Sequence, residues 1–176
     1  MTIRTATSGD AGKLHQIYLK AFDESERELV ADLAVDLLRQ ESEPETIHLV
    51  ADKDGELLGH VAFSPVYAKR SGQCIGYTMA PLAVDPGFHK QGIGSQLVRE
   101  GLKQMNDRNV SLVLVYGDPA YYGRFGFAAE LAESYIPPYK LQYPFGWLAI
   151  ALNDQLPTIV EEPIECVPAL SKPELW

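Results

Sequence analysis

The chain has 176 residues, 46% of them hydrophobic and 10% aromatic, a composition that predicts one globular domain with a buried core and argues against disorder. Its formal net charge of -9 disfavours a nucleic-acid-binding protein, which needs a basic face, and fits either a cationic partner or simple solubility. The N-terminus lacks the apolar core of a secretory signal, and no apolar run is long enough to span a bilayer. We therefore expect a cytoplasmic protein that contacts neither nucleic acid nor membrane. The two cysteines, Cys74 and Cys166, stand in no metal or redox spacing, so we expect reduced thiols and no metal.

The N-terminal half predicts one strand, two helices and three strands. The expected elements are a strand at residues 3–6, a helix that Ser8 or Asp10 caps, a second helix at about 25–39, and strands at 46–52, 57–66 and 77–84. The first helix has one apolar face, made of Leu14, Ile17, Tyr18 and Ala21. Asp54-Gly55 is the signal of a tight hairpin turn between the second and third strands.

The C-terminal half predicts a helix, a buried strand and a proline-rich end. The helix after residue 92 carries a single apolar stripe, made of Ile93, Leu97, Val98, Leu102 and Met105. The segment at residues 111–118 contains an almost continuous apolar run and is typical of a strand buried on both faces. A short helix or turn at 118–127, a strand at 147–152 and an extended piece at 164–167 complete the expected elements.

This order, βααβββαβαβ with a tail, predicts a mostly antiparallel sheet with helices on its faces. One parallel crossover joins the strand at 77–84 to the strand at 112–115 and brings the two near each other. No repeat or change of composition divides the chain. We expect a domain at residues 1–152 and a C-terminal extension at 153–176 that packs on the same domain.

The glycine-rich loop after the strand at 77–84 is the most informative segment. A Walker loop needs a lysine between Gly94 and Ser95, and a Rossmann fingerprint needs a third glycine, so neither pattern fits. The sequence from Val84, Val-Asp-Pro-x-x-His-x-x-Gly-x-Gly, resembles the acetyl-coenzyme A (acetyl-CoA) loop of the GNAT family of N-acetyltransferases. That loop is usually Gln/Arg-x-x-Gly-x-Gly/Ala, and His89 stands where Gln or Arg is usual. Free amides at a helix start, together with the helix dipole, suit a diphosphate.

A second segment agrees with the same family. In "DPAYYGRFGF" Tyr122 precedes Gly126-Phe127 by four residues, as in the family's other hallmark. The longer segment "GDPAYYGRFGF" resembles the branch of the family that includes the bacterial YhbS-type acetyltransferases. The resemblance extends from Ile3 to about Leu152.

The resemblance implies the α/β (α+β) GNAT acyl-CoA N-acyltransferase fold. Its mixed, mostly antiparallel sheet has helices on both faces and splays at the strand before the phosphate loop, where Pro81 suits a splay point or an edge. It further implies acetyl transfer from acetyl-CoA, as cosubstrate, to a primary amine of a small molecule or peptide in a ternary complex. The Leu82 amide would stabilise the oxyanion, and Tyr122 would be the general acid. The implied cofactor-binding residues are Leu82, Ala83, Val84, His89, Lys90, Gln91, Gly92, Ile93, Gly94, Ser95 and Tyr122.

The general base and the acceptor are not identified by the sequence. Glu24, Glu26 and His60 are candidate bases, although the glutamates also fit a solvated helix start and the histidine a partly buried sheet position. Four aromatic residues either line an acceptor pocket or serve packing, namely Tyr135, Tyr139, Tyr143 and Phe145. A non-catalytic acetyl-CoA sensor and an unrelated nucleotide-binding domain remain alternatives, and a homodimer is possible.

Overall fold

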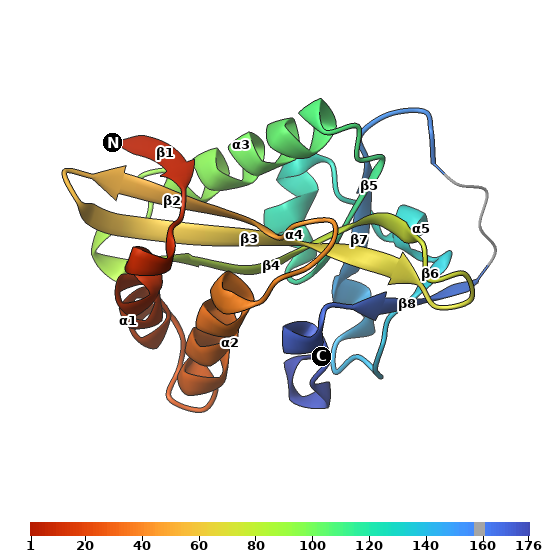
Figure 1. Ribbon diagram of the computed structural model, residues 1–176, viewed down its shortest axis with the longest axis horizontal. Helices are drawn as coiled ribbons and strands as arrows, with labels where there is room; N and C mark the ends of the chain where they lie inside the picture. The colour runs from red at the N-terminus through yellow and green to blue at the C-terminus, as the bar shows by residue number, and fades with distance from the viewer. Residues whose placement is uncertain (157–160) are drawn as a thin grey trace. The chain divides into compact units, whose positions relative to one another are not determined.

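The computed structural model describes residues 1–156 and 161–176 (Figure 1). The elements in chain order are β1 (Thr2–Thr5), α1 (Ala11–Ala21), α2 (Arg27–Arg39), β2 (Ile47–Lys53), β3 (Glu56–Ala68), β4 (Cys74–Val84), α3 (Ile93–Asp107), β5 (Leu112–Tyr116), α4 (Pro119–Tyr122), α5 (Ala129–Ala132), β6 (Tyr135–Ile136), β7 (Trp147–Ala151) and β8 (Glu162–Cys166). The predicted order is confirmed. The short α5 and β6 were not predicted, and β8 begins two residues before the expected extended piece.

The chain forms two compact units, and β3, β4 and α3 contribute to both. The first unit comprises residues 1–63 and 81–101, and the second comprises residues 64–80 and 102–176. The limits of the predicted domain and of its C-terminal extension stay a prediction. No helix in the described part of the chain is long and apolar enough to cross a membrane.

The first unit contains an antiparallel sheet of β1, β2 and the first part of β3. The predicted hairpin between β2 and β3 is confirmed, because Asp54 and Gly55 have φ angles of 54° and 86°, as a tight turn of that type requires. Helices α1 and α2 lie side by side on one face of this sheet (Figure 1). Their buried residues Leu14, Tyr18 and Ala34 belong to one core cluster with Val50 of β2.

The first half of α3 covers the opposite face of the same sheet. A Cβ on Gly59 would lie 3.1 Å from Cδ1 of Leu97 and 3.0 Å from the carbonyl oxygen of Ala83, so β3 and α3 approach each other closely there. Since successive strand residues point to opposite faces, the neighbouring His60 faces α1. The prediction of helices on both faces is thus confirmed for this unit.

The start of α1 differs from the prediction that Ser8 or Asp10 caps it with a side-chain oxygen. Residues Ser8–Asp10 form a 3₁₀ turn, and the carboxylate of Asp10 makes no capping bond to α1. It instead accepts hydrogen bonds from the amide of Thr7 (2.8 Å) and from the guanidinium of Arg4 (2.8 Å). The capping prediction was wrong because Arg4, on the preceding strand, offers a stronger charged partner.

The second unit contains β5, buried at residues 112–115, between a parallel and an antiparallel neighbour. The predicted parallel pairing of β4 with β5 is confirmed at Tyr77–Val113 and Thr78–Leu114. Strand β8 pairs antiparallel with the end of β3, opposing Cys166 to Val66, and parallel with β6. The terminal Trp176 stacks on Tyr116 of β5, with ring centroids 6.2 Å apart and planes inclined by 8°.

Candidate active site

The loop after β4 is held by its own hydrogen bonds. The amide of Asp85 donates to the carbonyl oxygen of Leu58 (2.9 Å), and residues Pro86–Phe88 form a 3₁₀ turn. Lys90 and Gly92 then adopt left-handed conformations, with φ angles of 62° and 77°. Glycine adopts this conformation at no steric cost, which explains one of the two glycines that the sequence placed in this loop.

The start of α3 presents a run of unpaired backbone amides. Within residues 1–156 and 161–176, the amides of Gln91 to Ser95 have no hydrogen-bond partner, and the first paired amide is that of Gln96, which donates to Gly92 (3.0 Å). The first turn of α3 contains no acidic residue that would compete for them. Free amides and the positive end of the helix dipole together form an anion-binding site of the kind that accepts phosphate groups.

The end of β4 provides the second part of the candidate site. Pro81 and Ala83 are buried, whereas Leu82 and Val84 are only partly buried. Pro81 has no amide and therefore cannot donate to a neighbouring strand. Among the described residues, the ladder between β4 and β5 is registered at Tyr77 and Thr78 of β4, while β5 itself extends to Tyr116. The parallel ladder is therefore short.

Tyr122 ends the short helix α4, which Asp118 caps by accepting from the amide of Ala120 (2.9 Å). Its ring meets those of Tyr121 and Phe127 edge to face, at centroid distances of 5.0 and 6.0 Å. In the described part of the chain, its hydroxyl has no hydrogen-bond partner. Burial, with smaller contributions from Tyr121 and Asp118, raises the pKa of this phenol well above its ordinary value. The hydroxyl therefore stays protonated at neutral pH.

The candidate bases lie in different surroundings. Glu24 and Glu26 are exposed at the start of α2, where Glu24 forms a loose ion pair with Arg27 (3.6 Å). His60 is fully buried, and both of its ring nitrogens are hydrogen-bonded. A histidine with no free nitrogen cannot accept a proton from a substrate without breaking one of these bonds.

His60 belongs to a buried chain of side chains that the sequence analysis missed. The carbonyl oxygen of Leu37 can only accept, so Nε2 of His48 donates to it (3.2 Å). His48 is neutral because burial lowers its pKa to about 4, so its Nδ1 accepts from Nε2 of His60 (3.1 Å). Tyr18 then donates to Nδ1 of His60 (2.8 Å). Burial, and then the neighbouring His48, lower the pKa of His60 well below its ordinary value.

This chain of bonds joins α1, β3, β2 and α2. The proton positions on Tyr18, His60 and His48 depend on one another, because only one arrangement of hydrogens gives every donor an acceptor along the chain. The sequence carried no signal of it, because a regular two-residue hairpin would place the two histidines on opposite faces. In the structure a bulge between Ala51 and Asp52 shifts the register, so that His48 pairs with Ala62, His60 pairs with Val50, and both histidines point to the same face of the β2–β3 hairpin.

The four aromatic residues of the predicted acceptor segment do not share one environment. Tyr135 is buried, and its carbonyl oxygen accepts from the indole of Trp147 (2.8 Å). Tyr143 and Phe145 are exposed, with their ring centroids 5.9 Å apart, and Tyr139 is partly buried. Their role at an acceptor site stays a prediction.

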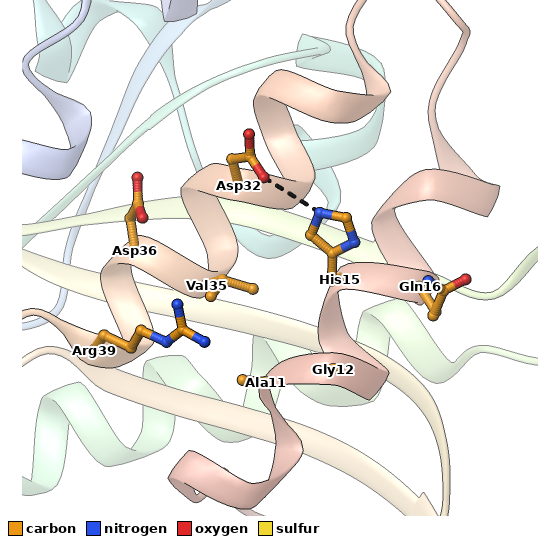
Figure 2. A pocket seen from close by; sticks show the side chains of 8 residues that line it. All are labelled: Ala11, Gly12, His15, Gln16, Asp32, Val35, Asp36 and Arg39. Carbon is orange, nitrogen blue, oxygen red and sulfur yellow. Dashed lines mark hydrogen bonds and ion pairs between the residues drawn. The ribbon is translucent and has the colours of Figure 1, made fainter.

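A hollow of about 350 Å³ lies between α1 and α2, and its lining residues all belong to these two helices (Figure 2). Figure 2 shows His15 of α1 pointing toward Asp32 of α2, with Nε2 and Oδ1 3.2 Å apart. Among the described residues, no three His, Cys, Asp or Glu side chains gather so as to hold a metal ion.

The sequence matches the family model "Acetyltransferase (GNAT) family" over residues 12–127. The chain therefore belongs to the GNAT family of acetyltransferases, and it has the fold of that family, a mixed and mostly antiparallel sheet with helices. It is 42% identical over 135 residues to the Escherichia coli protein "Uncharacterized N-acetyltransferase YhbS", which covers 75% of each chain. It is 28% identical over 162 residues to the E. coli "Uncharacterized N-acetyltransferase YjhQ", covering 90% of this chain and 88% of the relative.

Two solved structures extend this similarity to three dimensions. The crystal structure of E. coli YhbS in complex with CoA has a TM-score of 0.83 and 29% identity, covering 97% of this chain and 92% of that one. A GNAT-family acetyltransferase from Brucella melitensis in complex with acetyl-CoA has a TM-score of 0.69 and 28% identity, covering 96% of this chain and 97% of that one.

Proposed function

We propose that this enzyme transfers the acetyl group of acetyl-CoA to a primary amine of a small-molecule or peptide acceptor, by direct attack in a ternary complex. The observation that carries the proposal is the run of unpaired amides from Gln91 to Ser95 at the start of α3. Relatives with the same fold were solved with CoA and with acetyl-CoA, which supports the choice of donor. Because acetyl-CoA is an intracellular metabolite, we also propose a cytoplasmic location.

The proposed binding of the donor follows from the chemistry of each segment. The diphosphate accepts from the loop amides, and the ammonium of Lys90 adds positive charge. The pantetheine chain pairs with the end of β4 like an added strand, and the short ladder between β4 and β5 supports this. The proposed donor-binding residues are Leu82, Ala83, Val84, His89, Lys90, Gln91, Gly92, Ile93, Gly94, Ser95 and Tyr122.

The proposed reaction begins when the neutral amine attacks the thioester carbonyl carbon, forming a C–N bond and an oxyanion. The amide of Leu82 donates a hydrogen bond to that oxygen. The C–S bond then breaks, and the thiolate takes the proton of the Tyr122 hydroxyl. The nitrogen loses its extra proton to solvent, and the phenol is reprotonated from solvent. The products are the N-acetyl amine and the free thiol of CoA.

The raised pKa of Tyr122 keeps the phenol neutral, so the hydroxyl can donate a hydrogen bond to the developing thiolate throughout the working pH range. The same shift makes the phenol a weaker acid, so the support for its role comes from its protonated state and not from its acid strength. The hydroxyl supports the same role, because among residues 1–156 and 161–176 it has no acceptor to give up before it donates.

The test is an acetylation screen that measures release of CoA thiol with polyamines, aminoglycosides, amino acids and peptides. We expect thiol release with at least one amine class, and thermal stabilisation by acetyl-CoA but not by ATP or NAD. A ligand at about 100 times its Kd stabilises by roughly 2.7 kcal/mol, which a melting curve resolves. Stabilisation by ATP or NAD in place of acetyl-CoA would overturn the proposal. Stabilisation by acetyl-CoA without thiol release from any amine would favour a sensor.

A further inference from the structure

The peptide group between Val84 and Asp85, where β4 passes into the loop, is fixed at both ends. Its carbonyl oxygen, on Val84, accepts from Nε2 of His89 (2.9 Å). Its amide, on Asp85, donates to Leu58 of β3 (2.9 Å). Because a carbonyl oxygen can only accept, Nε2 of His89 must carry the proton. His89 therefore donates across the base of the loop to the last residue of the strand.

The side chain of Asp85 fixes the same point from a second direction. One carboxylate oxygen accepts from the amide of Gly87 (2.9 Å), and the other accepts from Nζ of Lys20 on α1 (2.8 Å). The ammonium of Lys20 lowers the pKa of the Asp85 carboxyl, so the carboxylate stays charged at neutral pH. The first half of the loop is thus tied to β3, to its own turn and to α1.

The residue after His89 needs this support. Lys90 has a φ angle of 62°, which places a residue with a Cβ in the left-handed region at a cost of about 1 kcal/mol. The unpaired amides begin at the next residue, Gln91. A loop that already has its bound shape loses less conformational entropy when a ligand arrives.

We propose that His89 is a positioning residue for the donor loop, which by donating from Nε2 to the carbonyl oxygen of Val84 holds the loop in the shape that aims the amides of Gln91 to Ser95 at a diphosphate. The inference rests on the proposed function, which assigns the donor to those amides. In this proposal the imidazole binds the protein backbone and does not contact the phosphate. His89 replaces the usual Gln or Arg because the imidazole, like those side chains, has an N–H to donate.

The test compares His89→Ala with His89→Gln, since the glutamine amide can also donate to the Val84 carbonyl. We expect His89→Ala to raise the KM and Kd for acetyl-CoA roughly 2- to 10-fold, the range for one hydrogen bond, with kcat changed less than about twofold. We expect His89→Gln to restore both constants to near the wild-type values. His15→Ala is the matched control, because His15 is also a surface histidine with a hydrogen-bonded Nε2, here to the carboxylate of Asp32, and lies outside the loop (Figure 2).

A second measurement is made without acetyl-CoA. Hydrogen exchange at the amide of Asp85 in the free protein should be faster in His89→Ala than in wild type, His89→Gln or His15→Ala. If wild-type protein fails to bind acetyl-CoA, the proposed function is wrong, and the exchange rates still decide the task of His89. Unchanged exchange in His89→Ala overturns the positioning role. So does a KM that His89→Gln fails to restore, because the imidazole itself would then be required.

Discussion

Gly117 leaves free the space that the ring of Tyr122 occupies. A Cβ atom at position 117 would lie 2.4 Å from Cε2 and 3.1 Å from Cδ2 of that ring. Gly117 directly follows β5, and its amide donates to the carbonyl oxygen of Gly146 (2.9 Å), so the backbone beneath the ring is itself held in place. The position of the proposed acid is therefore set by a residue that has no side chain.

We expect Gly117→Ala to lower kcat by about tenfold or more, because the added methyl group displaces the Tyr122 ring and a misplaced acid transfers its proton poorly. The measurement is kcat at saturating donor and acceptor, with a melting curve to follow stability. Gly123→Ala is the control, since a Cβ there meets none of the described residues within 4 Å and Gly123 has a helical conformation. Equal kcat values for the two variants would contradict the prediction.

Tyr122→Phe should lower kcat by roughly 10²- to 10⁴-fold, because the leaving thiolate then lacks its proton donor. Tyr121→Phe is the neighbouring control and should retain most of the activity. Because burial raises the pKa of the Tyr122 phenol, its acid form persists as the pH rises past the ordinary value near 10. The wild-type kcat should therefore show no alkaline loss from this group below about pH 10. Full activity in Tyr122→Phe would remove the role of the hydroxyl.

Local signals predicted the parts of the fold and of the site that depend on neighbouring residues. Asp54-Gly55 specified its turn, the apolar face of α1 specified its buried side, and the glycines specified the loop before α3. Each of these structures is decided within a few residues, so the sequence pattern alone carries it.

Contacts between distant residues could not be predicted in the same way. Lys20 and Asp85 are 65 residues apart, and Tyr18 and His60 are 42 apart, so no local pattern joins either pair. The exposed Phe145 and the buried Tyr135 look alike in the sequence, since only packing from other elements decides which aromatic ring is covered. The capping prediction for Asp10 was wrong because its partner, Arg4, belongs to another element.

Gly92→Ala should weaken donor binding, with a KM for acetyl-CoA that rises about fivefold. Gly92 has a φ angle of 77°, which alanine adopts only at a cost of about 1 kcal/mol. The nearest atom to an added Cβ is 4.0 Å away on Gln96, so the effect comes from the backbone and not from a clash. Gly12→Ala in α1 is the control, because in the part of the chain that the structure describes a Cβ there meets nothing within 4 Å. A Gly92→Ala variant with wild-type KM would show that donor binding does not depend on a glycine at position 92.

Tyr18→Phe should lower the free energy of unfolding by about 1–3 kcal/mol. The change removes the donor to Nδ1 of His60 and leaves that buried acceptor unsatisfied. Nδ1 of His60 cannot become a donor instead, because the single proton of the neutral ring is on Nε2, which donates to His48. Urea unfolding at pH 7 measures the loss, and Tyr143→Phe, at an exposed position, should change stability by less than about 0.5 kcal/mol. Similar losses in both variants would contradict the assigned direction of the bonds.

The two buried histidines should make the folded state sensitive to mild acid. An unfolded histidine has a pKa of about 6.5, whereas burial lowers that of His48 to about 4 and that of His60 well below its ordinary value. The unfolded state thus binds more protons, so stability is fully present above about pH 6.5 and falls as the pH drops toward 4. For His48 alone the loss is on the order of 3 kcal/mol across that window.

Urea unfolding between pH 7 and 4.5 measures how the free energy of unfolding changes with pH. In this range the contribution of the histidines is separable from that of the carboxylates. The pKa of Asp10 is lowered by its bonds to Arg4, so its contribution is retained until the pH falls below about 4, the ordinary value of an aspartate. His15→Ala should keep the slope, because His15 lies on the surface of α1. A free energy of unfolding that stays flat from pH 6.5 to 4.5 would mean that His48 and His60 bind protons as readily in the folded state as in the unfolded state. The assigned direction of the hydrogen bonds from Tyr18 to Leu37 would then be wrong.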